Sequence, residues 1–519
     1  MSGGDKVIRL TSSQGFSDTW TNAAKPSTLN LLDFNIPSGL VVDMSKSYIS
    51  LNSNITNNAG EIVNASFYLD VNGNEVFNVP NSALVRNCSI SASNVGQLES
   101  IIRQDSLACG LWSASHTSVE AKSDMNSLSA YNGSAGSKIY TTFGLDRVSN
   151  NMTNDGSTIV TGLNGANLTS ANINRDLKIP LRDIFGVGAI EDFDTSKWGD
   201  VDIHLETNCK LLKAKQWGGD EDTTNGFDGT TAQGAMADIV FAIGDKLTSV
   251  TTKTAYGEWE YTCPFYVGQT CILKATASGG LLPVFSAGGE EVVIKSIQFQ
   301  QDNTANPPTG NNKVTITFED NTYLVTTAGT ASAITLEAKV NDANLQMVIN
   351  RAELVLFLND TQNTANAYEY MTYVSEQDNG NGLTSFNRGY MVEGNAENVM
   401  IACINNSAIL PLTPITSYRY AIDNEEQTGN RDIVTNSPLQ YDRLQRCLEY
   451  SAQIPFRNAQ MRFYQSTQTQ GAVYSEPISL ICETLETSPE SRMLNLSVES
   501  AGGLQQLILY KQIPRQISI

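Results

Sequence analysis

The chain has 519 residues, of which 40% are apolar and 17% are charged, and its formal net charge is −21 at pH 7. So acidic a surface repels phosphate, which argues against direct binding of nucleic acid and against docking to an anionic membrane. Asn, Thr, Ser and Gly replace the missing charges and favour turns and strand edges over helices, so the composition predicts an all-β or β-dominated protein of roughly two to four domains.

Two further features bear on where the protein resides. The first twenty residues hold no apolar core of the kind that a secretory signal peptide needs, and no run of about 18 apolar residues indicates a membrane span. No Cys-x-x-Cys pair occurs, so we expect small buried thiols in a reducing compartment, with a disulfide as the less favoured alternative. The cysteines are Cys88, Cys109, Cys209, Cys263, Cys271, Cys403, Cys447 and Cys482.

Apolar patterns predict strands early in the chain. Residues 43–55 form the first such segment. Residues 66–79, SFYLDVNGNEVFNV, are typical of a hairpin, because Asn72 and Gly73 supply a two-residue turn between two apolar runs. The same segment lacks the ligand spacing of an EF-hand, so a calcium loop is the less favoured interpretation.

Residues 93–113, SNVGQLESIIRQDSLACGLWS, are the best helix candidate of the first half. Leu98, Ile101 and Ile102 follow a period of about 3.6 residues, and Ser93 or Asn94 is placed to cap the helix. A polar, turn-rich region follows as far as residue 174, and we expect it to form exposed loops.

Residues 179–188, IPLRDIFGVG, stand out in a chain this polar. We expect a buried plug where one sheet edge meets the next domain, with Pro180 ending a strand ladder and Gly186 and Gly188 turning the chain. The alternative is a buried loop such as any β-sandwich contains. The candidate core residues at this closure are Ile179, Pro180, Leu181, Ile184, Phe185 and Trp198.

The middle of the chain mixes strand signals with a break. Val201, Ile203 and Leu205 alternate with polar residues, which predicts a strand with one wet face. Residues 216–234 are rich in glycine and acidic residues and are predicted to be a linker or a long loop. Short strands with little helix are expected within residues 259–340.

The last third repeats the layout of the first. It opens on an apolar strand at 345–360, contains a helix at 437–452 that starts near Pro438, and closes on strand-like residues 493–513. Each block thus holds one helix after a loop between apolar strands, which predicts two β-sandwich domains of similar organisation.

Residues 179–206 resemble a motif of the double jelly-roll major capsid proteins, with the best local match to those of virophages and polinton-like viruses. In that family a Pro-Leu-x-x-x-Phe element, here Pro180 to Phe185, precedes the last strands of the first jelly roll. Other similar pieces follow the family's order, at residues 41–55, 81–107 and 418–444. Residues 216–344 contain no piece that matches.

The resemblance implies an all-β fold: two eight-stranded antiparallel jelly rolls in one chain, a few short helices in loops and a β-rich middle segment. The expected division is an N-terminal arm (1–24), a first jelly roll (25–215), a linker and β-rich middle segment (216–344), and a second jelly roll (345–519). The middle segment is either an insertion or the start of the second jelly roll.

The resemblance also implies a function. It indicates a structural protein, the major capsid protein of a dsDNA virus, whose homotrimers have a pseudo-hexameric outline and tile an icosahedral shell. The implied partners are further copies of the chain, penton proteins and minor capsid proteins, with no direct nucleic-acid contact. The implied location is the virion, after assembly inside the infected host cell.

A β-sandwich adhesin or receptor-binding fibre, extracellular or on a virion surface, is the alternative function. Such a protein needs aromatic residues gathered on a loop surface for stacking on sugars. The five tryptophans are dispersed along the sequence, which counts against it. They are Trp20, Trp112, Trp198, Trp217 and Trp259.

An enzyme is not indicated. The sequence has two histidines, His116 and His204, and no G-x-S-x-G, H-E-x-x-H or P-loop motif. His204 falls on the polar side of its predicted strand, as a surface histidine does. The densest acidic loop, Asp423 to Asp432, is interpreted as solvated rather than as a cation site. We therefore expect no catalysis, no cofactor and no metal.

Overall fold

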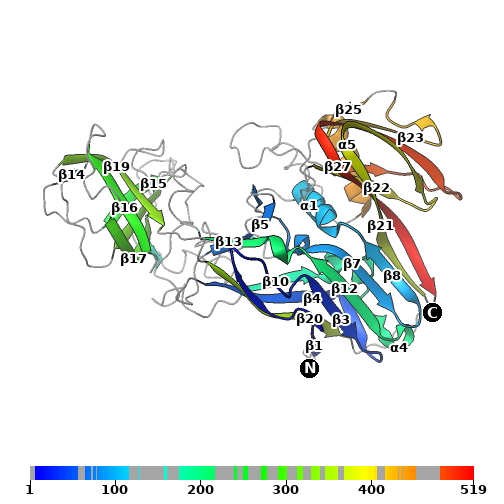
Figure 1. Cartoon of the computed structure of the whole chain (residues 1–519), viewed down its shortest axis with the longest axis horizontal. Helices are drawn as coiled ribbons and strands as arrows, with labels where there is room; N and C mark the ends of the chain where they lie inside the picture. Colours follow the sequence, from blue (N-terminus) through cyan, green and yellow to red (C-terminus); the bar gives the residue numbers. More distant parts are fainter. Residues whose placement is uncertain are drawn as a thin grey trace.

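The structure is a computed structural model of the whole chain (Figure 1). The residues that it describes are 6–56, 65–71, 74–76, 79–115, 128, 157–160, 175–216, 239–241, 249–254, 270–277, 290–300, 312–318, 329–338, 345–359, 367–405, 415–429, 432–434, 437–451 and 480–518.

Two antiparallel sheets contain most strands of the first half of the chain together with one later strand, β20. The first sheet has the order β1-β20-β4-β10, with β2 also paired to β20 and β11 to β4; the second has the order β3-β12-β7-β8. The strands of the first sheet are β1 (Lys6–Thr11), β2 (Asp18–Thr21), β4 (Val41–Thr56), β10 (Arg175–Pro180), β11 (Phe193–Asp194) and β20 (Gln346–Leu358). Those of the second are β3 (Leu31–Ile36), β7 (Val85–Ala92), β8 (Gly96–Ile101) and β12 (Val201–Thr207).

The order of these strands identifies the fold. If β1 and β2 together count as strand one, then β3, β4, β7, β8, β10, β12 and β20 are strands two to eight along the chain. The first sheet then has the order 1-8-3-6 and the second the order 2-7-4-5. That is the strand order of a jelly roll, in which two Greek keys wrap around one core.

The second half repeats this order with fewer breaks. The long strands β21 and β27 pair along their whole lengths, and each contributes to both sheets. The later half of β27 pairs with β22, and β22 pairs with β26. The earlier half of β27 pairs with β23, and β23 pairs with both β24 and β25. The elements are β21 (Ala367–Val392), β22 (Asn398–Asn405), β23 (Ile415–Ile422), β24 (Glu425–Glu426), β25 (Ile433–Val434), α5 (Pro438–Ser451), β26 (Leu480–Thr484) and β27 (Arg492–Ser518).

With the two halves of β21 counted as strands one and two, and those of β27 as seven and eight, the second unit also has the order 1-8-3-6 and 2-7-4-5. The chain is a double jelly roll. The all-β prediction with two antiparallel jelly rolls and few helices is therefore confirmed.

The strand pairing differs from the expected domain boundaries at two places. The predicted N-terminal arm contains β1 and β2, which pair with β20 as the first strand of the first jelly roll. Strand β20, which the sequence assigned to the second jelly roll, lies between β1 and β4 and completes the first. We therefore place the boundary between the two jelly rolls after residue 359. Sequence alone missed both because the paired segments are hundreds of residues apart.

The segment between β12 and β20 includes a separate sheet, which Figure 1 shows apart from the two jelly rolls. Its order is β14-β19-β16-β17-β18-β15, and β9 (Ser157–Val160) pairs with β17. Because these strands come between the seventh and eighth strands of the first jelly roll, we infer an insertion there. Its strands are β14 (Ile239–Phe241), β15 (Ser249–Thr254), β16 (Thr270–Ala277), β17 (Glu290–Gln300), β18 (Asn312–Phe318) and β19 (Gly329–Ala338). The predicted linker at 216–234 lies almost wholly outside the described residues.

The local predictions have mixed outcomes. Strand β4, the helix α5 and the hairpin of β5 (Ala65–Val71) with β6 (Asn74–Val76) are confirmed. The helix predicted from residue 93 is wrong in its first half, because residues 96–101 form β8 beside β7. The helix α1 begins only at Gln104 and runs to Ser115. Between them Arg103 has a φ of 58°, which separates strand from helix.

Each jelly roll has its own apolar interior. The cluster in the second includes Val399 and Ile401 of β22, whereas their neighbours Met400 and Ala402 belong to the cluster of the first. Successive strand residues point to opposite faces of a sheet. One face of β22 therefore lies in the core of the second jelly roll, and its other face packs against the first.

Candidate functional site at the junction of the two jelly rolls

The segment that stood out in the sequence lies at this junction. Strand β10 ends at Pro180, and short 3-10 turns follow, η4 (Leu181–Asp183) and η5 (Gly186–Ala189). The carbonyl of Leu181 accepts from the backbone N–H groups of Ile184, at 3.2 Å, and Phe185, at 2.9 Å. These bonds fold the apolar residues back onto the end of the first sheet.

Five of the six candidate core residues are buried. The exposed fractions are 1% for Ile179, 0% for Leu181, 1% for Ile184, 2% for Phe185 and 0% for Trp198. Pro180 differs: it is half-buried and pairs with Tyr48 on the side of the sheet away from Ile179. Because proline has no N–H to donate, the last position of an edge strand suits it. That these residues close the first jelly roll remains a prediction.

The two glycines have a role other than the expected one. Neither is among the residues with positive φ, so neither supplies a left-handed turn. A Cβ on Gly186 would lie 1.7 Å from the carbonyl oxygen of Met371 in β21, and one on Gly188 would lie 2.5 Å from the carbonyl carbon of Leu181. Gly186 is thus required because the two jelly rolls approach so closely that no side chain fits between their backbones.

Trp198 connects the two jelly rolls through aromatic contacts. It ends the short helix α4 (Thr195–Trp198) and stacks on Phe193, with ring centroids 4.8 Å apart. Its ring is also 5.2 Å from that of Tyr368 in β21. The hydroxyl of Tyr368 donates to the carbonyl of Asp192 at 3.0 Å. An aromatic stack of this kind stabilises the contact beyond the area that it buries.

Glu99 of β8 is a buried carboxylate at the same contact, 2% exposed. It accepts hydrogen bonds from the N–H groups of Gly186 (2.9 Å) and Val187 (2.5 Å) and from the hydroxyl of Thr372 in β21 (2.8 Å). Burial raises the pKa of Glu99, while these hydrogen bonds and the charge of Arg515 oppose the rise. One carboxylate thus fastens η5 to its own jelly roll and to the next one.

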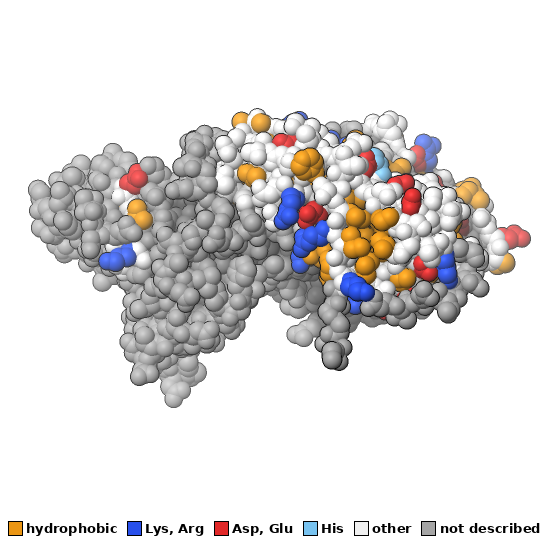
Figure 2. Space-filling model, turned by 90° about the horizontal axis from the view of Figure 1, so that it is seen from below, with side chains coloured by type: hydrophobic (Ala, Val, Ile, Leu, Met, Phe, Trp, Pro, Cys, Tyr) orange, Lys and Arg blue, Asp and Glu red, His pale blue; other side chains and the backbone are white. Residues whose placement is uncertain are grey.

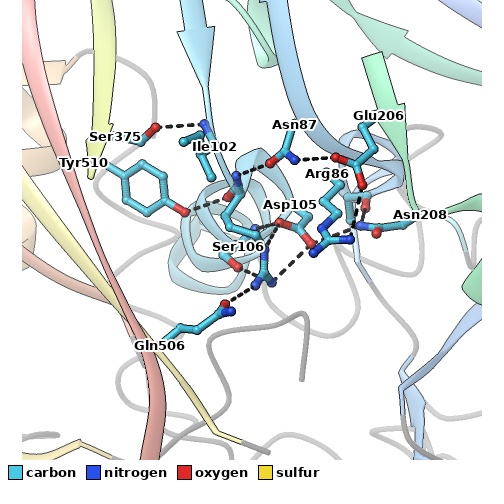
Figure 3. A network of polar contacts seen from close by, with 12 residues as sticks. Arg86, Asn87, Ile102, Asp105, Ser106, Glu206, Asn208, Ser375, Gln506 and Tyr510 are labelled. Carbon is cyan, nitrogen blue, oxygen red and sulfur yellow. Dashed lines mark hydrogen bonds and ion pairs between the residues drawn. The ribbon is translucent and has the colours of Figure 1, made fainter. Parts of the chain in front are cut away.

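A second polar network lies at the start of α1, and Figure 3 labels Asp105, Gln506 and Tyr510 among its members. Its centre is Arg103, the residue before α1. Its guanidinium donates from Nε to Asp105 at 3.0 Å and from Nη1 to Gln506 of β27 at 2.7 Å. Its carbonyl accepts from the hydroxyl of Tyr510, also in β27, at 2.6 Å. Nearby, the N–H of Ile102 donates to the Ser375 hydroxyl of β21 at 2.8 Å. The turn before α1 is therefore bound to two strands of the second jelly roll.

Arg103 and Asp105 are 4% and 0% exposed. Because water cannot solvate these charges, they compensate each other through the hydrogen bond between them. Asn208 donates to the second Asp105 oxygen at 3.0 Å. Burial raises the pKa of Asp105, against the lowering effects of Arg103, Asn208 and the Ser106 N–H. A buried pair of this kind tolerates little movement, because displacing one partner leaves an unpaired charge. The network thereby fixes the relative position of the two jelly rolls.

The second jelly roll has a comparable network beside its own helix. Glu483 of β26 accepts from the hydroxyls of Tyr418 (2.7 Å) and Tyr420 (3.1 Å) and from the Arg443 guanidinium of α5 (2.6 Å). Burial raises the pKa of Glu483, with Arg443 the largest opposing cause. These bonds hold α5 on the second jelly roll as those of Asp105 hold the start of α1 on the first.

The sequence did not single out these polar residues. Glu99, Arg103 and Asp105 lie in the run QLESIIRQDSL, where each charge interrupts an apolar pattern. The sequence pattern predicted a helix for this run and gave these three charges no role. A charge beside several apolar residues is the signal that could have marked them as buried.

The structure places the other candidate residues as follows. His204 is exposed on β12 and contacts Asp33, whereas His116 lies outside the described residues. In the acidic loop, Arg419 forms ion pairs: its Nε lies 3.8 Å from a carboxylate oxygen of Glu426 and 3.9 Å from one of Asp432. Within the described part of the chain, no group of three or more His, Cys, Asp or Glu residues is arranged to hold a metal ion. That the protein needs no cofactor and no metal remains a prediction.

The structure describes the side chains of five cysteines, and all five are free and buried. They are Cys88, Cys109, Cys209, Cys447 and Cys482. Burial raises the pKa of Cys209 to about 11, which makes this thiol a poor nucleophile at neutral pH.

In the described ranges no helix is both long and apolar enough to cross a bilayer.

No protein-family model and no curated protein matches the chain. Solved structures do match. A chain in the cryo-EM structure of the Sputnik virophage has a TM-score of 0.32 and 9% identity, covering 99% of this chain and 87% of that one. The mavirus major capsid protein has a TM-score of 0.32 and 9% identity, and the match covers 98% of this chain and 86% of the mavirus chain.

The major capsid protein of Sulfolobus Turreted Icosahedral Virus has a TM-score of 0.30 and 9% identity. The match covers 98% of this chain and 96% of the viral one. The likeness concerns the fold alone. The double jelly roll of this chain rests on its own strand order.

Proposed function

We propose that the chain is a structural protein, the major capsid protein of an icosahedral virus, and that it assembles as homotrimers of pseudo-hexameric outline. The observation that carries the proposal is the presence of two jelly rolls with the same strand order, held side by side by a buried junction. Three such chains in a ring present six similar jelly rolls, and closed cyclic symmetry is the usual outcome for a soluble homo-oligomer.

The junction supports this proposal because a lattice unit must not flex. Glu99 and Arg103 each bind groups from both jelly rolls. Gly186 brings the two backbones into direct contact. A satisfied buried network of this kind favours one arrangement over its alternatives. The pair of jelly rolls is thereby suited to act as one rigid block.

The net negative charge of the chain limits which partners it can bind. Three chains at −21 each carry −63 together, so we propose that the capsomer does not bind the viral genome directly. Its partners would be other capsomers, penton proteins and minor capsid proteins. The proposed location is the virion, with assembly inside the infected host cell, and the proposed role is structural rather than enzymatic.

Light scattering on the purified protein tests the proposal. A trimer would have three times the chain mass of 56.3 kDa, or about 169 kDa, across micromolar concentrations at neutral pH. Electron microscopy of the same sample should show rings with six lobes. A mass near that of one chain would contradict the trimer, and elongated spikes would favour the receptor-binding fibre instead.

A further inference from the structure

Figure 2 shows apolar side chains that gather on the side of the molecule where β1 lies. Leu354 and Leu356 of β20 belong to the core, so Val355 between them faces this side, yet it is only 1% exposed. Two cations of the same sheet, Arg9 and Lys46, are paired with acidic residues of that sheet. The groups on this surface therefore have partners within the chain, and the reactive groups that the junction does not use lie in the interior.

Two of the buried thiols lie together at the edge of the second jelly roll. Cys447 is in α5 and Cys482 is in β26, and their thiols are hydrogen-bonded to each other. Both are free, and their exposed fractions are 0% and 1%. A disulfide requires two cysteines that lie side by side, as these two do.

The packing of α5 against β26 brings the two thiols together. Arg443 of α5 donates to Glu483 of β26 at 2.6 Å. Cys447 lies one helical turn further along α5, and Cys482 is the residue before Glu483. Successive strand residues point to opposite faces of a sheet, and α5 contacts both of these. Because β26 is the last strand of its sheet, α5 lies across its free edge.

The pair is close to the junction of the two jelly rolls. Both cysteines, with Leu444 of α5 and Leu480 of β26, belong to the core cluster of the first jelly roll. The helix α1 of the first jelly roll also contacts β26. A covalent bond between the two cysteines would therefore fix α5 and β26 where they support the junction.

The folded protein protects the thiols from reaction. Burial raises the pKa of Cys482, and the Cys447 thiol and the Glu483 carboxylate raise it further. The thiolate is the form that attacks a disulfide, and an oxidant must reach it. Oxidation therefore requires α5 to move away from β26, and the ion pair of Arg443 with Glu483 opposes that movement.

We propose that Cys447 and Cys482 form a disulfide when the protein meets an oxidising medium, and that displacement of α5 from β26 controls the reaction. In a reducing compartment both thiols stay free. In an oxidising one the bond closes residues 447–482 into a loop, which restricts the unfolded chain and retains α5 on the second jelly roll. The bond would form whether or not the chain builds a capsid.

The oxidant is a small disulfide, such as oxidised glutathione. The thiolate of one cysteine attacks a sulfur of this disulfide, and one glutathione leaves and takes up a proton. The thiolate of the other cysteine then attacks the mixed disulfide, and the second glutathione leaves in the same way. Two protein thiols are thereby oxidised to one disulfide, and one oxidised glutathione is reduced to two glutathione thiols.

Thiol counting on the reduced, full-length protein tests the proposal. The protein is incubated with oxidised glutathione below its melting temperature and then denatured for counting. We expect six of the eight thiols to remain, because one pair is lost. The tryptic peptides 447–457 and 463–492, which carry one cysteine each, should be recovered joined by a disulfide. The melting temperature should rise by roughly 5–10 °C and fall again after reduction.

Cysteine variants identify the pair. Cys447→Ala and Cys482→Ala should each give no joined peptides and no rise in melting temperature. The matched control is Cys209→Ala, which removes another buried thiol, one that is hydrogen-bonded to the Thr207 hydroxyl. It should still form the link. A wild type that keeps all eight thiols, or that joins other cysteines, would overturn the proposal.

A variant of α5 tests how the reaction is controlled. Arg443→Gln leaves Glu483 without its ion pair, so α5 should leave β26 more often and thiol loss should be about tenfold faster or more. Arg446→Gln, an exposed position on the same helix, should react at the rate of the wild type. Equal rates for Arg443→Gln and the wild type would overturn the role of α5.

Discussion

The two jelly rolls differ in the connection between their sixth and seventh strands. In the first, residues 181–200 form three short helical turns and bury Leu181, Phe185 and Trp198. In the second, residues 485–491 bury only Leu485 of the whole connection. Glu99 accepts two N–H bonds from the first connection, whereas the second is attached by backbone bonds such as Ser488 N to the Gly394 carbonyl at 2.7 Å.

The difference follows from what each connection faces. The first connection meets β21 of the neighbouring jelly roll within the same chain, so its apolar residues and close backbone approach have a permanent partner. The second faces no other jelly roll of its own chain in the described residues. A polar exposed surface does not promote aggregation as an apolar patch does. The second connection is polar and acidic. Position in the chain therefore explains the difference between two equivalent loops.

The largest expected effect is the loss of the Phe185 ring. Phe185→Ala should lower the free energy of unfolding by about 3–5 kcal/mol, because it removes a buried aromatic side chain and leaves a cavity. Pro489→Ala, an exposed position in the second connection, should change it by less than about 0.5 kcal/mol. Thermal melting of both variants measures the difference. Equal melting temperatures would mean that the first connection is a surface loop like the second.

A methyl group at Gly186 tests the close approach of the backbones. Gly186→Ala should cost about 1–3 kcal/mol, because the added carbon meets the rigid carbonyl of Met371. Gly389→Ala is the matched control, since a Cβ there would meet only the side chains of Asn495 and Met493, which can move. Urea unfolding of the two variants measures the contrast. A Gly186→Ala protein as stable as the control would show that the two jelly rolls separate at little cost.

The pH dependence of stability tests Glu99. Burial raises its pKa, so the folded protein holds this proton more tightly than the unfolded chain does. Stability from this group is therefore present at low pH and is lost as the pH rises from the ordinary value of 4.5 through the raised one, by at most about 1.4 kcal/mol per pH unit.

Glu99→Gln should remove that part of the slope, whereas Glu191→Gln, an exposed position in the same connection, should leave it. Urea unfolding at a series of pH values measures both slopes. An unchanged slope in Glu99→Gln would show that the carboxylate does not hold its proton in the folded state.

The smallest effect is expected from the histidines. Replacing His116 and His204 together by Ala should leave the oligomer mass unchanged, because His204 is an exposed residue on the outer side of β12 and neither histidine belongs to a catalytic motif. Light scattering gives the mass, and hydrolase assays on the same preparation check for activity. A hydrolytic activity of the wild type that disappears in this variant would contradict a purely structural role.

The sequence alone determined the features that depend on neighbouring residues. An apolar pattern marked β4 and alternation marked β12. A two-residue Asn-Gly turn marked the β5–β6 hairpin, and the position of Pro438 marked the start of α5. The cluster of apolar residues at 179–185 indicated burial. In each case the deciding contacts are local, so the pattern survives without knowledge of the rest of the chain.

Only the tertiary structure decided the features that depend on distant partners. Residues 96–101 became a strand because β7 offered an edge, against a helical pattern of their own. Strand β20 joined the first jelly roll through pairs such as Leu354 with Ile49, about three hundred residues apart. The burial of Glu99 and Arg103 followed from the approach of the second jelly roll. Pairing and charge compensation across such separations leave no periodic trace in a sequence, because any complementary segment of the chain could supply them.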